Sequence, residues 1–236
     1  MNNIETIPLD NLAYMLIPVV VVLIILAKWK LNTGNALYAI CRMLVQLLAI
    51  GYFLDALFTS DSAYITLLIL AVMLLFASWI ALDIVKKNRR QLFINVVFSL
   101  AAACGFTLAI VVVAVLELDP WYEPRYIIPL GGMILANAMS SISLAAERYQ
   151  SELANNNQTL ARNIAYKAAL IPTINVLFAV GLVSLPGMMT GQILSGVSPF
   201  IAARYQIMVM CMLFASSGLS AACFLFLIEK NHQKKL

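Results

Sequence analysis

The chain has 236 residues, of which 63% are apolar and 11% are charged, and its mean hydropathy is +0.92. This composition indicates an integral membrane protein, and we expect no separate soluble domain. The formal net charge of +4 calls for no nucleic-acid partner, because basic loops are the ordinary signal of membrane topology.

Apolar stretches of about 20 residues can each cross the hydrocarbon core of a bilayer as a helix. In chain order they cover roughly residues 11–29, 36–57, 62–82, 92–116, 126–146, 163–185 and 200–228, which gives about seven spans. These runs are continuously apolar and do not alternate, which favours helices over barrel strands. The sequence therefore predicts an all-α, multi-pass membrane protein with one transmembrane domain over residues 1–236.

Basic residues gather in alternate loops. They follow the first, third, fifth and last spans: Lys28, Lys30, Lys86, Lys87, Arg89, Arg90, Arg148, Arg162, Lys230, Lys234 and Lys235. Cytoplasmic loops carry the excess of Lys and Arg. We therefore expect the amino terminus outside and the carboxyl terminus in the cytoplasm of a cell (inner) membrane.

Residues needed by several enzyme classes are missing from the predicted spans. The single histidine, His232, lies in the polar tail, and the four cysteines show no C-x-x-C pairing. The chain also has no phosphate-binding G-x-x-x-x-G-K-[ST] loop. We predict that it is not an enzyme and binds no cofactor itself, so any ATP would be hydrolysed by a partner.

Polar side chains inside the spans are costly in lipid and usually face a bundle interior or a cavity. In the second span, Arg42 and Gln46 share one helix face. Arg42 either snorkels to the headgroups or belongs to a substrate pathway or structural ion pair. In the fifth span, the run PLGGMILANAM contains Pro129, Asn137 and Met139, and we expect an irregular helix there.

The sixth and last spans contain further polar residues, helix breakers and methionines. The candidates are Pro172, Asn175, Pro186, Gly187, Met188, Met189 and Gly191, followed by Gln206 and Met208. Prolines that free backbone carbonyls are tolerated where they line a cavity, so the prolines and glycines are candidate hinges. Thioethers suit soft ions such as Cu(I), but adaptable core packing is their commoner use. The identity of any metal ion stays open.

Five segments together carry a resemblance. They are R-x-x-x-Q-L-x-x-x-G-Y (42–52), IPLGGMILANAM (128–139), ALIPTIN (169–175), GLVSLPGMMTGQI (181–193) and YQIMV (205–209). In this order they resemble the FetB-type permease family, with bacterial iron-export permeases and plant relatives linked to aluminium tolerance. The resemblance implies the membrane subunit of an ABC exporter, working as two permeases with two separately encoded ATPases.

The stretch AERYQSELANNNQTLARNIAYK (146–167) departs from the family, in which it is usually longer and contains a Leu-Gly-Ala turn. By resemblance it is the ATPase coupling loop, with Glu147, Arg148, Glu152 and Arg162 as candidate contacts. Asn155, Asn156 and Asn157 are poor helix formers. Either the docking helix is reduced, or this member has lost or altered its coupling to ATP. A third interpretation is that the stretch is an ordinary solvated connector.

Two function classes follow. The first is a permease that exports iron, another metal ion or a small solute, with Arg42, Gln46, Asn137, Met139, Asn175, Met188, Met189, Gln206 and Met208 as hypothetical pathway residues. Its expected partners are the ATPase, a second permease copy, membrane lipid and the transported solute. The second class is an ATP-independent channel, a secondary carrier or a membrane scaffold.

Overall fold

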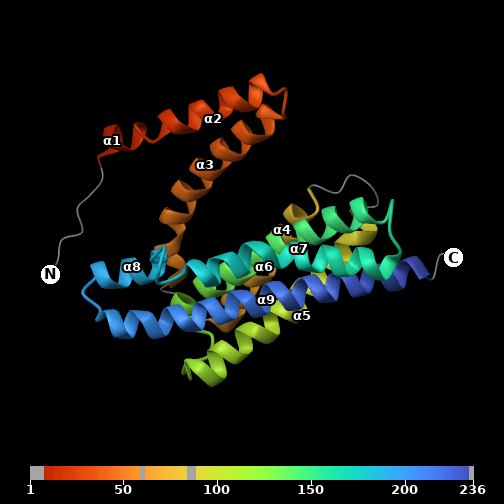
Figure 1. Ribbon diagram of the computed structural model, residues 1–236. Coiled ribbons are helices and arrows are strands. Elements are labelled where there is room, and N and C mark those ends of the chain that lie inside the picture. The colour runs from red at the N-terminus through yellow and green to blue at the C-terminus, as the bar shows by residue number, and fades with distance from the viewer. Residues whose placement is uncertain (1–7, 59–61, 84–88, 234–236) are drawn as a thin grey trace. The chain divides into compact units, whose positions relative to one another are not determined.

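The computed structural model describes residues 8–58, 62–83 and 89–233, and Figure 1 shows its helices. Their bounds are α1 Leu9–Ala13, α2 Leu16–Lys28, α3 Thr33–Phe58, α4 Ala63–Ala81, α5 Arg89–Ile110, η1 Val111–Val115, α6 Pro124–Glu152, α7 Gln158–Ala179, α8 Gly187–Leu194 and α9 Pro199–Gln233. Within these ranges, β-pairing is limited to one isolated bridge between Val180 and Ser184. The all-α prediction is confirmed.

The chain divides into two compact units, residues 1–60 and 61–236. In the first unit, α2 packs against α3 across a tight turn in which Lys30 has a φ of 56°. Apolar side chains such as Ile24 and Leu48 are exposed on the surface of this unit, as suits helices in lipid. The prediction of one domain over the whole chain stays a prediction.

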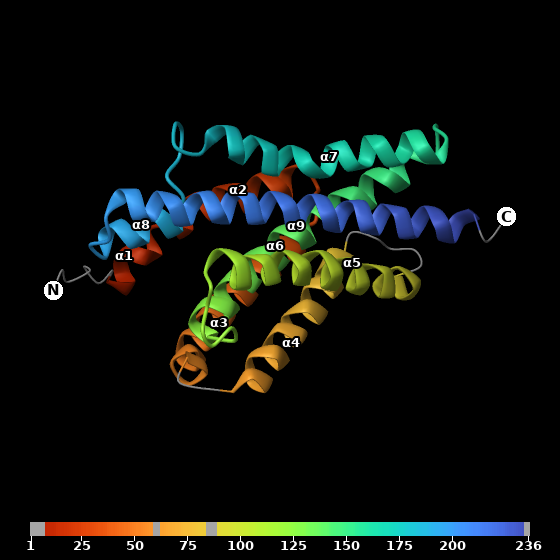
Figure 2. The same cartoon turned by 90° about the horizontal axis from the view of Figure 1, so that it is seen from below.

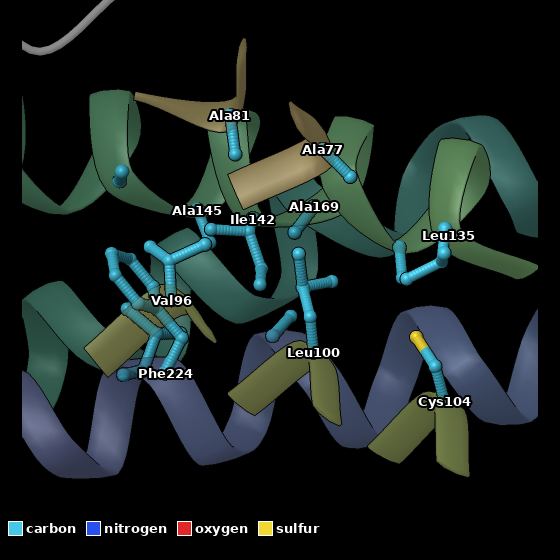
Figure 3. Close-up of a cluster of buried hydrophobic side chains, with 14 of the residues drawn as sticks. Ala77, Ala81, Val96, Leu100, Cys104, Leu135, Ile142, Ala145, Ala169 and Phe224 are labelled. Carbon is cyan, nitrogen blue, oxygen red and sulfur yellow. The ribbon is translucent and has the colours of Figure 1, made fainter. Parts of the chain in front are cut away.

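In the second unit, α6 packs against α4, α5, α7 and α9 (Figures 1 and 2). Figure 2 shows α7 and α9 side by side along most of their length. Small side chains, among them Ala77, Ala81 and Ala145, let these helices approach closely around Ile142 and Phe224 (Figure 3). Lipid tails are as apolar as the core, so this close packing rather than the hydrophobic effect holds the helices together.

Six helical segments in the described residues are long and apolar enough to cross a membrane. They are Asp10–Lys28, Thr33–Gly51, Ala63–Ala81, Leu92–Val115, Pro124–Glu152 and Pro199–Lys230. The expected span 163–185 is not among them, so the count of seven is not confirmed. The physical reason is that α7 ends at Ala179 and its first half carries Arg162, Asn163 and Lys167. The predicted orientation of the termini stays a prediction.

The helices run through two of the predicted break points. Pro129 lies inside α6 and Pro172 inside α7. A proline removes one backbone N–H, but in a membrane bundle neighbouring groups compensate and the helix can continue. The irregular turn lies instead at η1, a π-helical segment that continues α5 and was not predicted.

Candidate functional site

A cavity of about 590 Å³ lies within the second unit. Its walls come from the end of η1, the first turns of α6, the short helix α8 and the first turns of α9: Leu116, Arg125, Tyr126, Pro129, Leu130, Met133, Met188, Gln192, Val197, Ile201, Tyr205 and Met208. This volume is typical of small-ligand sites, which are mostly apolar with a few polar groups.

The segment GLVSLPGMMTG shapes one side of this cavity. After α7 ends, Gly181 adopts a φ of 83°, and its N–H donates to the Ser184 carbonyl at 3.0 Å. Pro186 then adopts an extended conformation and precedes α8, which begins at Gly187. A second glycine with positive φ, Gly196 at 90°, separates α8 from α9. These two turns place α8 against α9, as Figure 1 shows.

Three methionines from three helices line the cavity: Met133 on α6, Met188 on α8 and Met208 on α9. Met188 and Met208 were predicted from the sequence as pathway residues, whereas Met133 was not. The signal for Met133 was its spacing, because Arg125, Pro129 and Met133 are four residues apart and share one face of α6. Met139 and Met189, which were predicted as pathway residues, are half-buried and do not line this cavity.

Two glutamine side chains have buried amide atoms without hydrogen-bond partners among the described residues. Gln206 on α9 is 4% exposed, and neither Oε1 nor Nε2 has a partner. Gln192 on α8 lines the cavity, and its Oε1 is also unpaired. Burying such groups costs free energy unless something else satisfies them. Gln206 was predicted as a pathway residue, whereas Gln192 was missed.

Asn137 joins α6 to α9. Its Nδ2 donates to the Leu213 carbonyl at 3.1 Å and to Ser217 Oγ at 2.6 Å. Ser217 is fully buried. The helix bundle itself therefore supplies the hydrogen-bond partners that the Asn137 amide needs in lipid. These bonds also join α6 to α9.

Four other predicted residues lie away from these contacts or in the other unit. Arg42 and Gln46 lie one turn apart on α3, with Arg42 half-buried and Gln46 exposed. Asn175 is exposed on α7. Gly191 lies inside α8 and does not break it.

The predicted coupling stretch is more helical than its sequence indicated. α6 extends to Glu152 and α7 begins at Gln158, so a short turn joins them in a hairpin. Asn157 is a poor helix former but a good N-cap, and its Oδ1 accepts from the Leu160 N–H at 2.8 Å. Asn155, Asn156 and Asn157 all lie in the turn between α6 and α7, outside both helices, as poor helix formers do.

Charged side chains pair at this end of the bundle. Arg148 and Glu152 form an ion pair at 2.7 Å within α6, while Glu147 is exposed. Arg162 on α7 reaches Glu229 on α9, with 2.7 Å between Nη1 and Oε2. The Glu229 side chain is only 12% exposed. Glu229 was not predicted as a candidate because it lies near the end of a span, where carboxylates are usually solvated.

The contacts show that α6 and α9 run parallel, in the same direction. Their first turns share the cavity, Asn137 contacts Leu213 and Ser217 further along, and α7 binds the end of α9 through Arg162 and Glu229. One pair of parallel helices therefore connects the cavity to the ionic end of the bundle.

The six described helices of membrane-spanning length define a multi-pass membrane protein. The chain belongs to UPF0014, described as an uncharacterised protein family, whose model matches residues 9–232. This assignment agrees with the resemblance found in the sequence.

Three relatives are similar over most of their length. The chain is 40% identical over 215 residues to a UPF0014 membrane protein of Synechocystis, covering 84% of this chain and 83% of the relative. It is 33% identical over 242 residues to the probable iron export permease protein FetB of Escherichia coli, covering 94% and 92%. It is 34% identical over 204 residues to the UPF0014 membrane protein STAR2 of rice, covering 80% and 70%. No solved structure matches the chain.

Proposed function

We propose that this chain is the membrane-spanning permease subunit of an ABC-type exporter for iron, another metal ion or a small solute. A separately encoded ATPase supplies ATP hydrolysis, and two copies of the permease form the transport unit. The observation that carries the proposal is the cavity between α6, α8 and α9, which combines the unpaired amide oxygen of Gln192 with three thioethers inside a membrane bundle. The similarity to an iron export permease supports the direction of transport and a metal cargo.

The α6–α7 hairpin is the proposed docking point for the ATPase. The last turns of α6 present exposed Glu147 and the pair of Arg148 and Glu152. Because the positive-inside rule assigns this end to the cytoplasm, it lies on the side where ATP is hydrolysed.

Movement of the hairpin would reach the cavity through α9. The ion pair of Arg162 with Glu229 fastens α7 to the far end of α9, whose first turns carry Tyr205 and Met208. We therefore propose alternating access, in which closure of the ATPase pulls on α9 and opens the cavity beside the turns around Gly181 and Gly196.

The direct test is co-purification. The tagged full-length chain is extracted from its native membrane in mild detergent, and the proteins bound to it are identified and quantified. We expect one ATPase subunit per permease. A second preparation with Glu147, Arg148 and Glu152 replaced by alanine should lose the ATPase but remain a folded membrane protein. A preparation with no ATPase, under conditions that preserve other ABC complexes, would favour an uncoupled channel, carrier or scaffold.

A further inference from the structure

The cavity brings together sulfur atoms that the sequence keeps far apart. Met133, Met188 and Met208 are separated by 55 and 20 residues along the chain and belong to different helices, yet all three line one hollow. Each of the three side chains is half-buried: it packs against the hydrophobic core and also lines the cavity. Methionine has a flexible side chain that adapts to a bound group.

The remaining lining groups disfavour a hard, highly charged cation. Among the described residues that line the cavity, none is Asp, Glu, His or Cys, and the charged one is Arg125. The repulsion between a guanidinium group and a cation is proportional to the charge of the cation. A trivalent ion therefore meets three times the repulsion of a monovalent ion at the same distance, with no carboxylate to offset it.

Thioether sulfur is a soft ligand that selects Cu(I)-like ions, whereas hard ions prefer oxygen. We propose that Met133, Met188 and Met208 form a binding site for a soft monovalent cation, with Cu⁺ and Ag⁺ as its representatives. The unpaired Oε1 of Gln192 lies in the same wall and accepts a hydrogen bond from water that enters with the ion. That the bound ion is also the transported cargo rests on the proposed function. That the ion binds to these three methionines does not.

The test uses two titrations of the purified full-length protein. Binding of Ag⁺ in nitrate buffer is measured by calorimetry. Binding of Cu⁺ is measured by competition with a chromophoric chelator. Thiols would compete for both ions, so all proteins carry Ala at Cys41, Cys104, Cys211 and Cys223. The site variant is M133L/M188L/M208L. The matched control M43L/M73L/M210L removes the same number of thioethers from positions outside the cavity wall.

We expect one Ag⁺ per chain in the background protein and in the control, and a loss of affinity of about 100-fold or more in the site variant. Fe²⁺ and Al³⁺ at the same concentration should not displace Ag⁺. We expect both variants to fold, because Leu is close to Met in volume. Gel filtration and thermal unfolding check this. Equal Ag⁺ affinity in the site and control variants would overturn the proposal, as would displacement of Ag⁺ by Fe²⁺.

The outcome is separable from that of the proposed function. If the ATPase co-purifies but the background protein binds no Ag⁺, the thioether site is wrong and the permease proposal stands. If Ag⁺ binds through the three methionines but no ATPase is found, the site stands and the ABC assignment fails.

Discussion

Arg162 on α7 and Glu229 on α9 are joined by an ion pair of 2.7 Å that is shielded mainly on the carboxylate side. Removing one partner leaves the other charge poorly solvated. The free energy lost in this way is larger than the net stabilisation that the intact pair provides. We expect Arg162→Gln to lower the free energy of unfolding by about 1–3 kcal/mol, less than for a fully buried pair because the guanidinium is partly exposed. Thermal unfolding in detergent measures this change.

The pair of Arg148 and Glu152 provides the comparison. It joins residues within one helix, and Arg148 is half exposed. Arg148→Gln should therefore cost only about 0.3–0.5 kcal/mol. The charge exchange R162E/E229R should recover part of the stability lost by either single change. Equal costs for Arg162→Gln and Arg148→Gln would contradict the role given to the α7–α9 pair.

Asn137 should couple energetically to Ser217, because its amide donates to that hydroxyl across the α6–α9 contact. In membrane bundles such a bond contributes about 0.6 kcal/mol and at most about 1.7 kcal/mol. A double-mutant cycle of Asn137→Ala with Ser217→Ala measures the coupling by thermal unfolding. The control cycle pairs Ser217→Ala with Ser140→Ala, whose hydroxyl bonds its own helix at Ala136. That cycle should give no coupling, and the prediction fails if the two cycles agree.

Replacing Gln206 should change stability and transport in different ways. Its buried amide has no partner among the described residues, so Gln206→Leu removes a polar group whose burial is unfavourable. We expect an unchanged or higher unfolding temperature together with slower transport, because the amide is proposed to bind the passing solute or its water. Unchanged transport in a stable Gln206→Leu protein would remove Gln206 from the pathway.

Gly181 should resist substitution because of its backbone conformation. Its φ of 83° is strained for any residue with a side chain, although a Cβ there would meet no atom within 4 Å. Gly181→Ala should cost about 1 kcal/mol and displace α8 from the cavity. Gly105→Ala, at an equally open but helical position, should be neutral or stabilising. A neutral Gly181→Ala would argue against the turn as the element that positions α8.

The apolar runs were sufficient to predict six segments of membrane-spanning length, because length and hydropathy dominate helix placement in lipid. The α6–α7 hairpin was harder to predict: the asparagines that disfavour a helix interior also form good caps, and Asn157 acts as one. Met133 and Glu229 were missed for a different reason. Their roles depend on which helices meet in space, and one sequence read along the chain does not specify that.

The central claim is that ATP hydrolysed by a partner moves a solute through the cavity of α6, α8 and α9. The most direct measurement is uptake of metal ions, among them iron and Ag⁺, into inside-out membrane vesicles containing the permease and its co-purifying ATPase. We expect uptake that requires ATP, stops with a non-hydrolysable analogue and is lost in M133L/M188L/M208L. Uptake that proceeds equally without ATP, or that is unchanged when those three side chains are replaced, would contradict it.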